Sequence, residues 1–171
     1  IDERPNYEHV TDIERTPDAG FLIASYTEYD PDIILVKLDS FGQKEWTRKI
    51  SYKVGTSSWS KEPHLLVEPN GSILVCATTI SNVFGHTPKL VFWNISPFGI
   101  VIDSILSESM DLKSLFRSKT GNIIAAGNTY ICQNQGFDCN EQRSIFILDS
   151  TFNLALDITL PWPYNHSSSN P

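Results

Sequence analysis

The sequence predicts an all-β protein made of about three four-stranded antiparallel units, and its internal repeats carry this prediction. A turn that ends in glycine precedes an apolar run with small residues three times, at Gly20, Gly71 and Gly121. These glycines recur about every 50 residues, which is a spacing typical of repeat architectures. No stretch shows a convincing apolar period of about 3.6 residues with helix caps. We therefore expect strands throughout.

Each unit has a second shared feature, an apolar run that leads into an aromatic turn. The runs read DIILVKLDSFG, KLVFWNISPFG and RSIFILDSTFN, and they place Phe41, Phe98 and Phe152 at the same position. One more short apolar-rich stretch follows each run. Because β-branched and aromatic residues fill the runs while Gly, Pro, Asn and Asp fill the gaps, every unit predicts four strands in the same order.

The expected strands can be placed unit by unit. The first unit has strands at 10–15, 21–27, 33–39 and 44–50, and the second at 64–68, 72–78, 90–95 and 101–106. The third has strands at 112–118, 122–128, 145–149 and 155–160. The glycine of each first turn suits a tight hairpin that needs a positive φ angle.

Four short antiparallel strands repeated at this period are typical of a β-propeller blade. Small side chains on the second strands, such as Ala24, Cys76 and Ala125, suit a strand near a crowded central axis. A twelve-stranded β-sandwich is the alternative, but a sandwich does not need the same strand order three times. The expected division is a lead-in at 1–9, blades at 10–62, 63–110 and 111–161, and a tail at 162–171.

The first unit resembles a blade repeat of secreted and surface proteins of Bacteroidota, and it is similar to blades of quinoprotein-like propellers. The match lies in Ala24-Ser25-Tyr26-Thr27, Val36-Lys37-Leu38-Asp39, Gly42 and Trp46, and the third unit keeps Ala126-Gly127-Asn128-Thr129. The resemblance spans residues 10–161. It implies a propeller fold and an extracytoplasmic location, whether secreted, periplasmic or on the outer surface. It implies no activity and no quinone, and we expect no cofactor and no metal.

Closure of the ring is a problem for three blades, because propellers usually close with about 4–8. Each end blade should leave one apolar face bare, and the exposed apolar area of such a face exceeds what a monomeric protein usually tolerates. We therefore expect the chain to pack against further blades of its parent chain, a second copy or another subunit. A fragment of a larger propeller is favoured over a six-bladed dimer. The bare faces should expose part of two alternating sets, which are Leu22, Ile34 and Val36 in the first unit and Ile124, Phe146 and Leu148 in the third.

Long and unequal loops are expected at one end of the blades, at 28–32, 79–89 and 129–144, together with the connections at 51–63 and 107–111. Loops on a rigid scaffold often carry binding sites, and aromatic residues are enriched at interfaces. In the alternative interpretation, Trp59 and Phe84 simply pin their own loops to the blades. The residues predicted to bind a partner are Tyr52, Trp59, Phe84, His86, Tyr130 and Phe137.

The cysteines point to an oxidising compartment. Cys132 and Cys139 lie close together in ICQNQGFDC, and a disulfide between them would stabilise the fold by on the order of 2.5 kcal/mol in the chain-entropy description. Two free thiols are the alternative. Cys76 lies in a strand of small residues, where we expect a buried apolar side chain.

Composition and motifs limit the possible functions. Thirteen Lys and Arg against twenty Asp and Glu give a net charge of −7, which argues against nucleic acid or an anionic membrane as the main partner. No apolar run approaches the roughly 20 residues of a transmembrane helix. The first residue is Ile1 rather than Met, so we expect a mature product or a fragment.

Common catalytic motifs, including G-x-S-x-G, H-E-x-x-H and phosphate loops, do not occur. The sequence therefore predicts a non-catalytic secreted or surface-associated propeller module for protein recognition or scaffolding within a larger assembly. The alternatives are a lectin-like propeller, in which Trp59 and Tyr130 would stack on sugars, and a fragment of a propeller enzyme.

Overall fold

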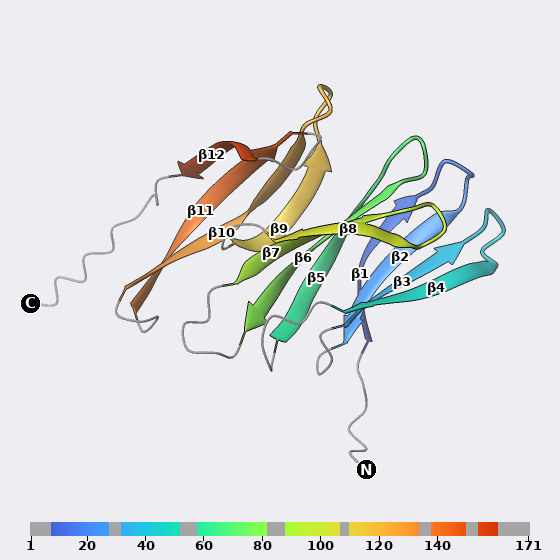
Figure 1. Cartoon of the computed structure of the whole chain (residues 1–171), viewed down its shortest axis with the longest axis horizontal. Coiled ribbons are helices and arrows are strands. Elements are labelled where there is room, and N and C mark those ends of the chain that lie inside the picture. Colours follow the sequence, from blue (N-terminus) through green and yellow to red (C-terminus); the bar gives the residue numbers. More distant parts are fainter. Residues whose placement is uncertain are drawn as a thin grey trace, which may run out of the picture.

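All regular structure in the described part of the chain is β-strand, arranged as three four-stranded antiparallel sheets. The computed structural model describes residues 8–27, 32–51, 58–81, 88–106, 110–133, 138–149 and 154–160. Figure 1 shows the sheets following one another in chain order. The predicted all-β class and the three four-stranded units are therefore confirmed. Within these ranges no helix is long and apolar enough to cross a membrane.

Each sheet is built from four consecutive strands that pair with their sequence neighbours. The first sheet contains β1 (Glu8–Arg15), β2 (Phe21–Thr27), β3 (Asp32–Leu38) and β4 (Lys44–Ser51). The second contains β5 (Ser58–Val67), β6 (Ile73–Ser81), β7 (Lys89–Ile95) and β8 (Val101–Leu106). The third contains β9 (Met110–Arg117), β10 (Ile123–Gln133), β11 (Asp138–Leu148) and β12 (Leu154–Leu160).

Two segments expected as loops or connections belong instead to strands. β5 begins at Ser58, inside the expected connection at 51–63. β10 and β11 extend to Gln133 and from Asp138, inside the expected loop at 129–144. Pairing with β9 ends at Thr129 and pairing with β12 ends at Arg143, so β10 and β11 continue as a two-stranded ribbon. Residues 133–143 are mostly polar, so the sequence pattern does not predict strands there.

The five described hairpin turns share one geometry. In each turn the first residue donates its N–H to the carbonyl of the fifth, and the fourth donates to the carbonyl of the first. The fourth residue has a positive φ angle, as in a type I turn followed by a bulge. Glycine is the usual residue there because it has no Cβ to clash. The five fourth residues are Ala19, Gly42, Gly71, Gly99 and Gly121.

This geometry corrects the sequence alignment of the first unit by one residue. Ala19, and not Gly20, is the counterpart of Gly71 and Gly121. Leu22 therefore corresponds to Leu74 and Ile124. We call the face of each sheet that carries these three residues its front face, and the opposite face its back face.

The shift matters because a one-residue change of register moves a side chain to the opposite face of a strand. Leu22 was expected on the bare outer face, but it is fully buried between the first two sheets. Phe146 and Leu148 were also expected outside, but they are buried against the second sheet. Ile34, Val36 and Ile124 do lie on the outer faces, because their strand positions alternate with buried neighbours.

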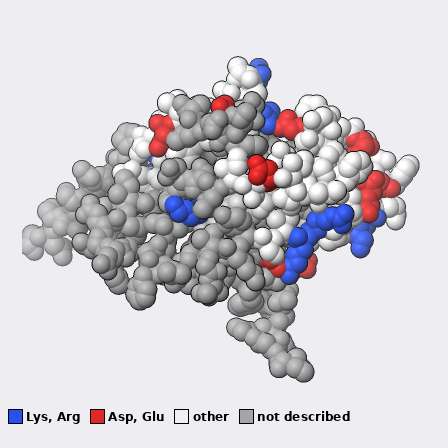
Figure 2. Space-filling view, viewed as in Figure 1, with Lys and Arg blue, Asp and Glu red and all other residues white. Residues whose placement is uncertain are grey.

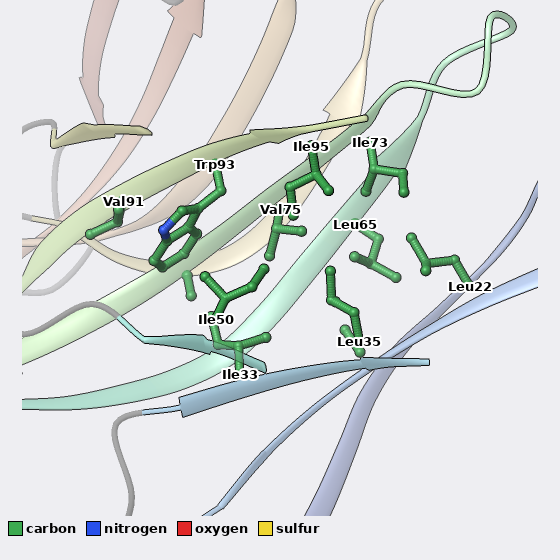
Figure 3. Close-up of a cluster of buried hydrophobic side chains, with 12 residues drawn as sticks. Leu22, Ile33, Leu35, Ile50, Leu65, Ile73, Val75, Val91, Trp93 and Ile95 are labelled. Carbon is green, nitrogen blue, oxygen red and sulfur yellow. The ribbon is translucent and has the colours of Figure 1, made fainter. Parts of the chain in front are cut away.

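The core consists of two clusters, one at each contact between neighbouring sheets. In the first cluster the front face of the first sheet packs on the back face of the second, which Figure 3 shows in close-up. In the second cluster the front face of the second sheet packs on the back face of the third. Both contacts therefore join unlike faces, front to back. The front-face side chains involved are Leu22, Ala24, Ile33 and Leu35 in the first contact and Leu74, Cys76, Leu90 and Phe92 in the second.

The first strand of each sheet packs on the preceding sheet. β5 contacts β1, β2 and β3, and β9 contacts β5, β6 and β7. Polar side chains hold these strands in place. The Asp12 carboxylate accepts a hydrogen bond from the Leu65 N–H at 2.8 Å. The Thr78 hydroxyl accepts one from the Leu112 N–H at 2.9 Å and donates to the Met110 carbonyl at 3.4 Å.

Replacing Ala19 with glycine should stabilise the protein, because Ala19 is held at a φ of 65° that favours glycine. We expect Ala19→Gly to raise the free energy of unfolding by about 1 kcal/mol, measured by urea denaturation. Gly20→Ala should lower it by about 2 kcal/mol, because the new Cβ would lie 2.2 Å from the Leu38 carbonyl oxygen. Equal or reversed effects would contradict the turn assignment.

Candidate functional site

The six residues predicted to bind a partner are only partly placed by the structure. Tyr52, Phe84, His86 and Phe137 lie outside the described residues. Trp59 lies on β5 opposite Ile80, and Tyr130 lies on β10 opposite Glu141, but their side chains are outside the description. The strands thus explain the backbone position of two of these residues. The loop-end binding site stays a prediction.

The two clustered cysteines occupy opposed positions on the β10–β11 ribbon. The strand register pairs Cys132 directly with Cys139. Directly opposed residues of antiparallel strands have Cα atoms about 4.5–5.5 Å apart, which lies within the range of disulfides. Their side chains lie outside the description, so the disulfide stays a prediction with which the register is compatible. Cys76 is buried as expected, and burial raises the pKa of its thiol, which disfavours the reactive thiolate.

We expect a Cys132–Cys139 disulfide in protein purified without reductant. Reduction should then add two hydrogen atoms to the intact mass and expose two alkylatable thiols, while Cys76 stays unreacted in the folded protein. Cys132→Ser is the matched control, and it should remove the mass change and lower the thermal unfolding midpoint. Two readily alkylated thiols in the unreduced protein would contradict the disulfide.

A small pocket of about 230 Å³ opens between the turn ends of the first two sheets. Its walls come from the β1–β2, β5–β6 and β7–β8 turns, each of which contributes one proline, and from β3 and β6. The pocket is therefore a consequence of three neighbouring hairpin turns meeting at one end of the first sheet contact. Its lining residues are Thr16, Pro17, Asp18, Lys37, Pro69, Asn70, Gly71, Ile73 and Pro97.

Lys37 is the buried charge of this pocket, with a side chain only 6 % exposed. Its ammonium donates to Asp18 and Glu45, each at 2.8 Å, and to the Leu38 carbonyl at 3.0 Å. Burial by itself lowers the pKa of Lys37, but the two carboxylates outweigh burial and raise it. Hydrogen bonds from Lys37 and then from Thr16 lower the pKa of Asp18 to about 2.

This arrangement holds the first hairpin in place. An ammonium has three donors, and all three of Lys37 are already used inside the protein. The Asp18 carboxylate also accepts hydrogen bonds from the Thr16 hydroxyl at 2.5 Å and the Gly20 N–H at 3.2 Å. The charged groups therefore fix the β1–β2 turn onto β3, and they offer little to a polar ligand.

Removing the ammonium should change the titration of Asp18. In Lys37→Met we expect the pKa of Asp18 to rise from about 2 toward its ordinary value of 3.8, measured by NMR of the carboxyl carbon. A carboxylate with a lowered pKa stabilises the folded state above its unfolded pKa, and this contribution is lost as the pH falls through its folded pKa. The unfolding midpoint of the variant should therefore fall less than that of the wild type between pH 4 and pH 2.

Lys44→Met is the matched control for this titration, because Lys44 lies on the same sheet, is exposed and makes no contact with the pocket. It should leave the pKa of Asp18 unchanged. An Asp18 pKa that stays near 2 in Lys37→Met would show that Thr16 and the turn backbone, rather than Lys37, hold the carboxylate ionised.

Two exposed apolar faces lie at opposite ends of the sheet array. The back face of the first sheet exposes Val10, Ile13 and Phe21, beside the half-buried Ile23, Ile34, Val36 and Leu38. The front face of the third sheet exposes Phe116, Leu156, Ile158 and Leu160, beside the half-buried Ile124, Ala126, Ile145 and Ile147. Sequence reasoning foresaw bare end faces but missed most of these residues, although the alternation of each strand carries the signal once its register is known.

Figure 2 shows acidic and basic side chains interspersed over the described part of one side of the molecule, with no large patch of a single sign. No group of three or more His, Cys, Asp or Glu residues placed to hold a metal ion occurs among the described residues. Neither a protein-family model nor a curated protein matches the chain.

Proposed function

We propose that the chain is an arc of a β-propeller and acts as a non-catalytic module for protein recognition or scaffolding in a larger extracytoplasmic assembly. The front-to-back stacking of three like sheets supports the propeller, since blades of a propeller are radial repeats of four-stranded sheets. The packing of each first strand on the preceding sheet also supports it, because first strands are then neighbours along the array.

The observation that carries the functional proposal is the pair of exposed apolar end faces. In both inner contacts, the front face of one sheet is buried against the back face of the next sheet. The exposed front face of the third sheet and the exposed back face of the first sheet are equivalent to these buried faces. Contiguous exposed apolar surfaces often mark interaction sites in soluble proteins. The working surfaces of the module are thus its two end sheets, which accept further protein.

Two further observations favour a binding role and an extracytoplasmic setting. The pKa of Asp18 is strongly lowered by its hydrogen bond with Lys37. Because this pair fixes the β1–β2 turn, the lowered pKa has a structural explanation and does not indicate a catalytic carboxylate. The opposed positions of Cys132 and Cys139 suit a disulfide, and disulfides persist in oxidising compartments.

A tandem protein tests whether the end faces accept further sheets. Two copies of the chain are joined by a Gly/Ser linker of about 15 residues. We expect one cooperative thermal transition, with a midpoint about 4 °C or more above that of the same tandem carrying Ile13→Lys in both copies. Binding of an apolar fluorescent dye should also be weaker in the unmodified tandem, because its end faces are covered.

A tandem with Phe41→Lys in both copies is the matched control. Phe41 is 88 % exposed at the β3–β4 turn, away from both end faces, so this change should have no effect. Equal unfolding midpoints and equal dye binding in all three tandems would contradict the proposed function.

A further inference from the structure

We propose that the partner of each end face is a second copy of this chain, bound head to tail. The front face of the third sheet of one copy packs on the back face of the first sheet of the other. This inference rests on the proposed function and names the partner of its two end surfaces.

The two inner contacts supply the pattern for this contact. Leu22 and Leu35 on the front of the first sheet meet Val75 on the back of the second, in one apolar cluster. Leu74 and Phe92 stand at the corresponding front positions in the second contact. At these two positions the third sheet has Ile124 and Ile145, so its front face keeps the apolar character that both inner contacts bury.

The receiving face on the first sheet matches the back faces that are already buried. Ile13 on β1 lies opposite Ile23, just as the buried Leu65 on β5 lies opposite Val75. Val36 takes the place that Trp93 holds in the second sheet.

The third sheet also has polar residues at the positions from which Asp12 and Thr78 bond to β5 and β9, the first strands of the following sheets. Asp12 accepts from the Leu65 N–H of the next sheet, and Ser114 takes the place of Asp12 on the front of β9. Thr78 bonds the backbone of β9, and Asn128 takes the place of Thr78 on the front of β10. Both substitutes have side chains that hydrogen-bond backbone groups. The front of the third sheet thus keeps the means to hold another first strand.

Two copies suffice to use every end face. Head-to-tail contacts give either closed rings or open fibres, depending on the rotation between copies. Two copies bring six four-stranded sheets together, which lies within the range of about 4–8 blades in closed propellers. The closed pair would have two identical contacts and leave no apolar end face in water.

Sedimentation velocity on the full chain and on two single variants tests the proposal. The wild type should sediment as a dimer of twice 19.3 kDa at micromolar concentration. Ile158→Lys places a charge on the front of the third sheet, and Ile13→Lys places one on the back of the first, where these side chains are 37 % and 58 % exposed. Each variant alone should sediment as a monomer, and the dissociation constant should rise at least 100-fold.

Mixing the two variants identifies the polarity of the contact. The Ile158→Lys chain retains an intact back face and the Ile13→Lys chain retains an intact front face. The mixture should therefore recover a one-to-one dimer with a single contact, detected at high concentration by sedimentation with one variant fluorescently labelled. Phe41→Lys is the matched control and should remain a dimer. If circular dichroism shows that a lysine variant is unfolded, serine at the same position replaces it.

Several results would overturn the inference. A wild type that remains monomeric at high concentration would do so, and so would a variant pair in which only one change dissociates the dimer. A mixture that recovers no dimer would exclude head-to-tail pairing. If the tandem protein closes while the single chain stays monomeric, the propeller proposal stands and a dimer of two separate chains is excluded. If the tandem gains nothing, the proposed function itself fails.

Discussion

The structure depends on one constraint, which is that each sheet has two apolar faces and needs a neighbour on both. In a strand, successive side chains point to opposite faces, so a sheet that alternates apolar with polar residues can leave one face in water. The inner strands β2, β3, β6 and β7 are largely apolar at both sets of positions. β7 illustrates this, because Leu90 and Phe92 point to the third sheet while Val91 and Trp93 point to the first. Among the described residues, the middle sheet is the one with both faces packed against another sheet.

Charged residues lie at the rim of the contact between the first two sheets, near the hairpin turns. Lys37 stands at the front position that Asn94 occupies in the second sheet, and its ammonium is turned toward Asp18 and Glu45. The stem of a lysine can cover apolar surface while its charged end is paired at the rim. The ion pair thus closes the turn end of the first contact without placing an unpaired charge in the core.

The fold class and strand order follow from the sequence because they depend on local residue types and on a period that repeats. The alignment of faces does not follow so directly. Gly20 looks like the counterpart of Gly71 and Gly121, but its role is close packing, since a Cβ there would meet the Leu38 carbonyl oxygen at 2.2 Å. Ala19 takes the left-handed position instead. A single-residue shift is invisible in the pattern of apolar runs, yet it exchanges the inner and outer face of the strand that follows the turn.

The β10–β11 ribbon and the sheet contacts escaped sequence reasoning for a different reason. Cys132 and Cys139 are close in sequence, but their direct opposition depends on the register of a hairpin with few apolar residues. The polar bonds between sheets are equally hard to foresee, because they do not repeat. In the first contact Asp12 holds the next first strand, whereas His64 occupies that position in the second sheet and Thr78 holds the strand instead.

The use of different polar groups at equivalent places has a physical explanation in the surroundings of His64. Burial lowers the pKa of its imidazole and so favours the neutral form, although the nearby Asp12 and Glu62 carboxylates oppose this effect. A neutral ring at the front of β5 fills space between sheets at a smaller desolvation cost than a second carboxylate would. On the adjacent strand, the hydroxyl of Thr78 is hydrogen-bonded to the backbone of β9. Each contact thus keeps a polar anchor for the incoming first strand, while the residue that supplies it changes with the packing around it.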